Sequence, residues 1–238
     1  MSETWLYWVG CAASYDQRNQ KVALAFVKLL KEAAVPFVIL GNVERCCGDP
    51  ARRLGNEYLY QSLVEHNKAA IEATGCSHIV TACPHCYRVL KHEYGFTRQE
   101  VVHHSELLAR LIADGRLTAE AKASKCGRTA YHDSCYLGRY EGVYEQPRSV
   151  LKTVTGLQLV ELPRHREQSF CCGGGGGRVF LEEPEGQRIN HLRTDEAIET
   201  AVSTVVTACP FCMTMLSDGA KDRDDAFTVL DLAEVLIR

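Results

Sequence analysis

The sequence predicts an α/β protein made of two pseudo-symmetric, Rossmann-like halves, each a small parallel sheet flanked by helices. Two observations lead to this prediction. Short apolar runs alternate with segments of helical periodicity along the chain, which is the pattern of parallel βαβ units. One cysteine pattern also occurs twice, at a nearly constant spacing, within the 238 residues. Because a sequence repeat reflects a repeated structural unit, both halves are expected to fold on the same plan.

Ten of the twelve cysteines belong to the repeated pattern. Matching cysteines are 124 residues apart at the start of the pattern (Cys11 and Cys135) and 126 residues apart at its end (Cys86 and Cys212). Each copy contains a lone cysteine, a vicinal pair and a Cys-Pro-x-Cys segment. The first five-cysteine set is Cys11, Cys46, Cys47, Cys83 and Cys86, and the second is Cys135, Cys171, Cys172, Cys209 and Cys212.

In the first half, apolar runs predict buried strands and segments with apolar residues at helical spacing predict helices. The predicted strands cover residues 5–10, 36–40 and 78–82, and a fourth begins at residue 101. Helices are predicted over residues 16–34 and 51–74, and further helices start at Pro84 and at Ser105, which is expected to be an N-cap. The loop between residues 41 and 50 holds the first vicinal cysteine pair.

The second half repeats this order. Its predicted strands cover residues 129–132, 157–162, 202–208 and 227–230. Its predicted helices cover residues 143–155 and 187–201, followed by a helix starting at Pro210 and a closing helix capped by Asp231. The loop over residues 170–177 holds the second vicinal pair and five consecutive glycines.

A polar stretch over residues 113–127 has no apolar periodicity and is expected to separate the halves. It divides the chain into a first cysteine-rich domain, residues 1–118, and a second, residues 119–238. The patterned cysteines follow predicted strands. Because the carboxyl ends of parallel strands meet at one edge of a sheet, each five-cysteine set is expected to converge there. A pseudo-twofold axis is expected to relate the halves.

Sets of thiolates at this spacing favour binding of zinc or of iron–sulfur clusters. Four cysteines complete a structural zinc site, so a fifth favours a multi-iron cluster, which has more coordination positions. A Cys-x-x-Cys at a helix start presents its two sulfurs near the positive end of the helix dipole. Gly48 and the glycines at 173–177 allow the backbone to approach a cluster closely and to donate N–H groups to it.

The remaining candidate residues have less specific interpretations. Cys76 and Cys126 lie outside the repeat and are expected to be structural. His85 lies between two patterned cysteines, but Phe211 stands at the matching place, so His85 is expected either to support the site or to be incidental, rather than to be a ligand. The glycine run does not follow a strand in the G-x-G-x-x-G arrangement and is not interpreted as a nucleotide loop.

Several charged or titratable residues lie close to the cysteines in sequence. His132 and Asp133 precede Cys135 and form a candidate proton shuttle, with an ordinary structural role as the alternative. His103 and His104 are expected to form an exposed helix start. Arginines near the cysteine loops either lie on the solvated surface or have a function. The functional alternatives are to balance the charge of an anionic cluster or to dock an acidic thiol substrate. These arginines are Arg45, Arg52, Arg53 and Arg178.

Composition narrows the class of protein. A net charge of −3 argues against nucleic acid as the main partner. No stretch approaches the roughly 20 apolar residues of a membrane span, and the first residues do not resemble a signal peptide. These features predict a cytoplasmic protein, either free or associated with a membrane-bound complex. In a reducing compartment, twelve cysteines indicate metal or redox chemistry rather than disulfides.

The two patterns C-x34-C-C-x35-C-P-x-C and C-x35-C-C-x36-C-P-x-C resemble the paired CCG, or cysteine-rich, domains of heterodisulfide reductase B and related iron–sulfur oxidoreductases. The segments that follow the vicinal pairs, residues 46–57 and 171–178, resemble the electron-transfer-flavoprotein-linked branch most. This resemblance implies that each five-cysteine set holds a noncubane [4Fe–4S] cluster. Some members carry zinc in one half, so zinc there is the alternative. The membrane helices and ferredoxin-type module of these family members are not seen in this chain. Either a partner subunit is expected to supply them, or the chain is a separate soluble version.

The sequence therefore supports three hypotheses. The first is an oxidoreductase subunit, like heterodisulfide reductase B, that passes electrons from a ferredoxin-type or flavoprotein subunit to a disulfide, a quinone or a similar acceptor. The second is a non-catalytic scaffold that binds zinc. The third is an electron relay without a substrate of its own. No catalytic residue is assigned, and the first and third hypotheses require iron and sulfide.

Overall fold

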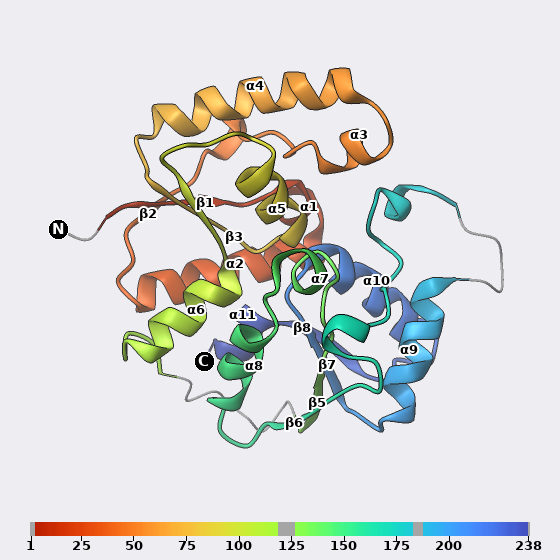
Figure 1. Cartoon of the computed structure of the whole chain (residues 1–238). Coiled ribbons are helices and arrows are strands. Elements are labelled where there is room, and N and C mark those ends of the chain that lie inside the picture. The colour runs from red at the N-terminus through yellow and green to blue at the C-terminus, as the bar shows by residue number, and fades with distance from the viewer. Residues whose placement is uncertain (1–2, 119–126, 183–187, 238) are drawn as a thin grey trace. The chain divides into compact units, whose positions relative to one another are not determined.

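The computed structural model describes residues 3–118, 127–182 and 188–237 (Figure 1). The chain divides into two compact units, Met1–Leu117 and Thr118–Arg238. Each unit contains one four-stranded parallel sheet flanked by helices. The predicted α/β class with two similar halves is confirmed.

The strands of the first unit lie in the order β2-β1-β3-β4, and all are parallel. They are β1 (Trp5–Trp8), β2 (Phe37–Val38), β3 (His78–Thr81) and β4 (Glu100–His103). The chain leaves β1 towards β2 and then returns past β1 to β3. The neighbouring strands β1 and β3 therefore flank the switch point at which such sheets bind ligands.

Helices cover both faces of this first sheet, as right-handed crossovers require. Figure 1 shows α2 and α6 on one face and α4 and α5 on the other. The helices are α1 (Cys11–Tyr15), α2 (Gln17–Glu32), α3 (Asp49–Arg53), α4 (Glu57–Ala73), α5 (Pro84–His92) and α6 (His104–Ala113), with a 3-10 turn, η1 (Gly41–Val43). The core includes Leu6, Phe26, Ile79 and Val80, which are fully buried.

The second unit repeats this arrangement with the strand order β6-β5-β7-β8. Its strands are β5 (Arg128–Tyr131), β6 (Gln158–Val160), β7 (Thr204–Thr207) and β8 (Thr228–Asp231). Helix α8 packs against α11, and α9 packs against α10. The helices are α7 (Gly138–Glu141), α8 (Glu145–Lys152), α9 (Ile189–Glu199), α10 (Pro210–Lys221) and α11 (Leu232–Leu236), with 3-10 turns η3 (Arg166–Gln168) and η4 (Arg178–Phe180).

The single helix predicted over residues 51–74 is wrong, because the chain forms two helices there. Helix α3 ends at Arg53, and Gly55 then adopts a φ of +85°, which an L side chain rarely tolerates. The side chain of Asn56 accepts a hydrogen bond from the backbone N–H of Leu59 and starts α4. The predicted helix over residues 187–201 is observed as α9, with Gln187 outside the described residues.

Two predictions about the start of α6 are also wrong. His103, not Ser105, is the N-cap, and it forms a capping box with Glu106. The rings of His103 and His104 are fully buried rather than exposed, and they contact each other edge to face. The predicted cap at Asp231 is confirmed, since its side chain accepts from the backbone N–H of Ala233.

None of the helices in the described ranges is long and apolar enough to cross a bilayer.

A buried ion network joins α8 to the segments that follow β5 and β6 in the second unit. Arg148 is 1% exposed and donates to both carboxylate oxygens of Asp133, at 2.7 and 2.8 Å. It also donates to both oxygens of Glu161, at 2.7 and 2.8 Å. Removal of one member of a buried ion pair leaves the other charge without compensation.

Arg148→Met is expected to lower the free energy of unfolding by about 3–5 kcal/mol, because it strands the buried carboxylate of Asp133. Arg166→Gln, which removes ion pairs to Glu145 and Glu161 at the surface, is the matched control and should cost about 1 kcal/mol or less. Urea denaturation of the two variants measures the difference. Equal losses would contradict the proposed importance of the network.

The same network predicts an acid-sensitive stability. Hydrogen bonds from Arg148 lower the pKa of Glu161 below its ordinary value of 4.5. A carboxyl whose pKa is lowered by folding stabilises the protein above its unfolded pKa, and this contribution is lost as the pH falls through the folded pKa. Arg148→Met should therefore flatten the decline in unfolding free energy below about pH 4.5, measured by urea titration. An unchanged decline would refute this.

Candidate functional site

The first five-cysteine set lies at the carboxyl ends of the two central strands of its sheet. Cys11 begins α1 three residues after β1 ends, and Cys83 follows β3 as the N-cap residue of α5. Pro84 occupies the first turn of α5, where its missing N–H costs nothing, and Cys86 follows within that turn. The loop before α3 brings in Cys46 and Cys47.

The structure brings all five sulfurs of this set together. The thiol of Cys11 lies 3.7 Å from the sulfur of Cys46. Further hydrogen bonds link the five thiols in the order Cys11, Cys46, Cys47, Cys86, Cys83. Cys11 and Cys46 are half-buried, whereas the other three are buried. Five sulfurs from three separate chain segments therefore form one cluster with two members near solvent.

The second five-cysteine set forms the same linked cluster in its own unit. The order of the hydrogen-bonded thiols is Cys135, Cys171, Cys172, Cys212, Cys209. The first two members are again half-buried and the other three buried. Phe211 and Met215 pack against the buried three. The repeat seen in the sequence is thus a repeat of side-chain geometry.

One sulfur in each set is a shared acceptor. Hydrogen bonds from Cys11, Cys47 and the backbone N–H of Gly48 lower the pKa of Cys46 to about 3. Bonds from Cys135, Cys172 and the Gly173 N–H lower the pKa of Cys171 to about 2. Thiols that donate to these sulfurs have raised pKa values, because the hydrogen bond favours their protonated form. Such a donor set could hold a metal ion or a metal–sulfur cluster, which would replace the thiol protons.

Polar side chains outside the pattern hold the first vicinal pair in place. The side chain of Asn67, fully buried on α4, accepts from the backbone N–H of Arg45 at 3.1 Å and donates to the carbonyl of Cys46 at 3.0 Å. The hydroxyl of Tyr94 donates to the carbonyl of Cys47 at 3.1 Å. These contacts satisfy backbone groups in a loop that has no strand partners.

Glu44 is a residue of the site that sequence reasoning missed. Its carboxylate accepts the backbone N–H groups of Val9, at 3.1 Å, and Gly10, at 2.6 Å. It therefore ties the loop before Cys46 to the segment before Cys11. Burial raises the pKa of Glu44 to about 7, despite these hydrogen bonds. Its position two residues before a cysteine pair was the one available signal.

His85 forms a buried hydrogen-bonded pair with Asp49. Its Nδ1 lies 2.8 Å from Oδ2 of Asp49, and both side chains are buried. The pair joins the vicinal-pair loop to α5. At the matching places of the second unit stand Gly174 and Phe211, and a Cβ added to Gly174 would lie 3.4 Å from the Cβ of Phe211. A hydrogen-bonded pair in one half is thus replaced by close packing in the other.

His132 lies beside the second set, but it does not pair with Asp133. His132, Cys172 and Cys212 each place one potential metal-ligating atom within 4.8 Å of the other two. Nδ1 of His132 accepts a hydrogen bond from Nε of Arg193 at 3.1 Å, whereas Asp133 binds Arg148. Burial lowers the pKa of His132 well below its ordinary value, and the charge of Arg193 adds to this shift.

The remaining candidate residues are the two cysteines outside the repeat and the four arginines near the cysteine loops. Cys76 is buried, and its backbone N–H donates to the hydroxyl of Thr74, which agrees with a structural role; Cys126 lies outside the described residues. Arg52 and Arg53 both pair with Glu93. Arg178 lines a separate cavity beside Asn190. Arg45 lines a cavity at the first set.

Comparison with known proteins then identifies the family. The model of the cysteine-rich domain CCG matches twice, over residues 5–91 and 129–217. The chain belongs to the CCG cysteine-rich domain family. Each match covers one of the five-cysteine sets described above.

Relatives of this CCG protein include the "Probable iron-sulfur-binding oxidoreductase FadF" of Bacillus subtilis, 47% identical over 98% of this chain and 33% of the relative. The EtfAB:quinone oxidoreductase of Syntrophomonas wolfei is 46% identical over 98% of this chain and 34% of the relative. One subunit of the dihydromethanophenazine:CoB–CoM heterodisulfide reductase of Methanosarcina barkeri is 33% identical over 97% of this chain and 58% of the relative. The chain thus spans about a third of the first two relatives.

Gly48→Ala is expected to destabilise the metal-free protein by about 2 kcal/mol or more. Gly48 has a φ of +90°, and an added Cβ would lie 2.7 Å from Cδ2 of Tyr60. Gly55→Ala is the matched control, because Gly55 has a φ of +85° but no atom within 4 Å of an added Cβ. Urea denaturation measures both. If the two variants lose the same stability, close packing at Gly48 is not important.

Proposed function

We propose that the chain is an iron–sulfur oxidoreductase unit in which each five-cysteine set holds one [4Fe–4S] cluster of the noncubane type. The ligands are the ten cysteines of the two sets, and each of the two domains, residues 1–118 and 119–238, carries one cluster. Convergence of five sulfurs in each unit supports this proposal, because four already complete a zinc site. When bound, such clusters supply one-electron transfer.

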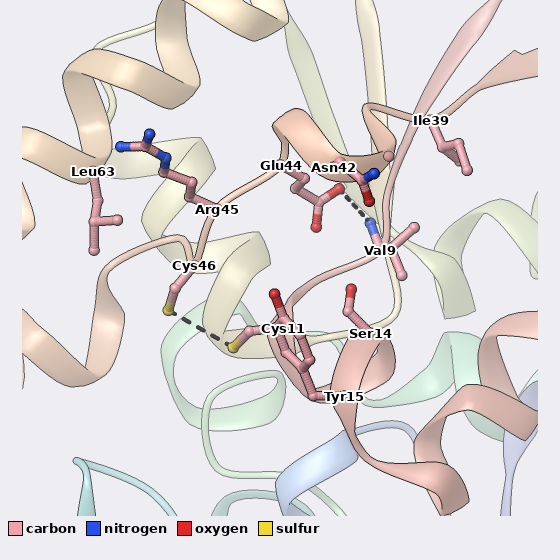
Figure 2. A pocket seen from close by; sticks show the side chains of 11 residues that line it. Val9, Cys11, Ser14, Tyr15, Ile39, Asn42, Glu44, Arg45, Cys46 and Leu63 are labelled. Carbon is pink, nitrogen blue, oxygen red and sulfur yellow. Dashed lines mark hydrogen bonds between the residues drawn. The ribbon is translucent and has the colours of Figure 1, made fainter.

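A cavity beside the first set is the observation that favours a substrate-reducing unit over a pure relay. Its volume is about 710 Å³, within the usual range of small-molecule sites. Figure 2 shows the sulfurs of Cys11 and Cys46 directed towards each other at its wall, with Ser14 and Tyr15 nearby. These are also the two half-buried cysteines of the set. An acceptor in this cavity would contact the sulfurs of the first set directly.

The walls of the cavity suit an acceptor with polar and apolar parts. Ile39 and Leu63 supply apolar surface, and Ser14 and Asn42 supply hydrogen-bonding groups. Figure 2 shows the guanidinium of Arg45 directed away from the two sulfurs. Glu44 is engaged with the backbone N–H groups of Val9 and Gly10, so its role is to hold the wall of the cavity.

The acceptor belongs to the two-electron class, a disulfide or a quinone. A disulfide takes two electrons and two protons as its S–S bond breaks, yielding two thiols, and a quinone takes the same number to become a quinol. The electrons come from a ferredoxin-type or flavoprotein partner, and the protons come from solvent. Both acceptor classes occur in the names of the relatives, a quinone oxidoreductase and a heterodisulfide reductase. We place this unit in the cytoplasm, in a complex with its redox partner.

Protein purified without oxygen is expected to contain about eight iron and eight sulfide per chain. Cys11→Ser should remove about half of both by disabling the first set. Cys76→Ser is the matched control, because Cys76 is buried but outside both sets, and it should leave the content unchanged. Iron and acid-labile sulfide analysis with EPR measures this outcome. Two zinc ions and no sulfide in the unmodified protein would overturn the proposal and support the scaffold alternative.

Adding a soluble disulfide or a quinone to the reduced protein tests the acceptor class. The compound that reoxidises the protein identifies that class. A bulky substitution in the cavity wall, Ser14→Trp, should block this reoxidation while leaving the iron content intact, since Ser14 lies in the cavity but supplies no sulfur. Iron-loaded protein that is oxidised by neither acceptor would favour the pure relay.

A further inference from the structure

The side chain of His132 presents an unexplained buried donor. The residue is 1% exposed, and its Nε2 has no hydrogen-bond partner in the part of the chain that the structure describes. An unpaired buried polar group destabilises the folded state, and each one in a native protein calls for an explanation such as a ligand, ion or water that the group faces. His132 lies with Cys172 and Cys212, two of the three buried members of the second five-cysteine set.

The contact with Arg193 determines which ring nitrogen carries the proton. The guanidinium of Arg193 donates through Nε to Nδ1 of His132, at 3.1 Å. Since a guanidinium has only donors, Nδ1 must accept with its lone pair. The ring proton is therefore on Nε2, which makes Nε2 a donor and not a metal ligand.

Arg193 is itself held rigidly. Its side chain is fully buried and donates through Nη1 to Glu196, at 2.8 Å, and to the carbonyl of Arg164, at 3.1 Å. Arg164 in turn pairs with Glu196 at 2.9 Å. This network orients the imidazole, so Arg193 is a positioning residue for His132.

The first unit carries a different donor at the equivalent place. Trp8 stands three residues before Cys11, as His132 stands three residues before Cys135. Trp8 ends β1, and His132 directly follows β5. Nε1 of Trp8 is likewise buried without a hydrogen-bond partner among residues 3–118, 127–182 and 188–237. The two units thus share a buried N–H at this position but differ in its chemistry and in the arginine behind it.

We propose that His132, oriented by Arg193, donates its Nε2–H to a sulfur of the group bound by the second five-cysteine set and raises the reduction potential of that group. The inference rests on the proposed function, since it requires a redox group at the second set. The physical reason is that reduction adds one negative charge, and a donor directed at a sulfur stabilises the more negative state. The added electron comes from the external reductant or redox partner, and no proton leaves the imidazole.

The test is an EPR-monitored redox titration of the whole, cluster-loaded chain. His132→Leu should lower the equilibrium constant for reduction of the second group about tenfold, or ~59 mV for one electron. His132→Gln, which keeps an N–H donor, should shift it less. Trp8→Phe is the matched control in the other unit and should leave the second group unchanged. Cys83→Ser and Cys209→Ser assign the signals to the two sets.

An unchanged potential of the second group in His132→Leu, with iron content intact, would overturn the inference. Loss of iron from the second set in that variant would also overturn it, because the ring would then be a ligand or a structural support. Absence of iron and sulfide from the unmodified protein would instead defeat the proposed function itself.

Labelling supplies a test without substitution. With ¹⁵N-histidine, electron–nuclear double resonance of the reduced protein should show a weak nitrogen coupling and an exchangeable proton. A strong coupling, as from a directly bound nitrogen, would refute the donor role. Arg193→Met should weaken the orientation of the ring and lower the potential in the same direction as His132→Leu.

Discussion

Two adjacent parallel strands end side by side in each unit, and the chain leaves them in opposite directions. In the first unit these are β1 and β3, followed by Cys11 and Cys83. Main-chain hydrogen bonding between the strands keeps their ends at a fixed separation, so the sulfurs that follow are held without help from the loops. The vicinal pair reaches the same edge through a loop that depends on side-chain contacts. The cluster of five sulfurs depends on this strand pairing in both units.

The loop that carries the vicinal pair is stabilised differently in the two halves. In the first unit Asn67, Tyr94 and Glu44 bind its backbone or its neighbours. In the second, the backbone carbonyl of Ser169 accepts a hydrogen bond from Arg139, and the Ser169 hydroxyl donates to the carbonyl of Asp133. The sulfur geometry is repeated although its supports are not. Under the proposed function, these supports are where the two sites would acquire different redox properties.

Buried charged residues are also distributed unequally between the two units. The second unit contains Arg148 and Arg193, both buried and both paired with carboxylates. The first has the smaller pair of Asp49 and His85. Arg193 also donates a hydrogen bond to the ring of His132, which lies beside Cys172 and Cys212.

Much of this protein could be predicted from local sequence signals. The duplicated cysteine spacing predicted two halves and the ten sulfurs that belong to the two sets. A sequence repeat indicates a repeated structural unit, however far apart in the chain the residues of that unit lie. The alternation of apolar runs and helical periodicity determined the parallel sheets. Capping at Asp231 was also local, since a cap contacts residues two or three positions away.

Tertiary structure alone decided what the remaining polar residues do. The burial of His103 and His104 and the contact of Glu44 with Gly10 depend on packing between segments far apart in the chain. The same is true of His132, whose adjacent Asp133 looked like its partner. Its actual partner, Arg193, lies 61 residues away. Periodicity indicates which face of an element is buried, but hydrogen-bond partners inside a core are chosen by the fold as a whole.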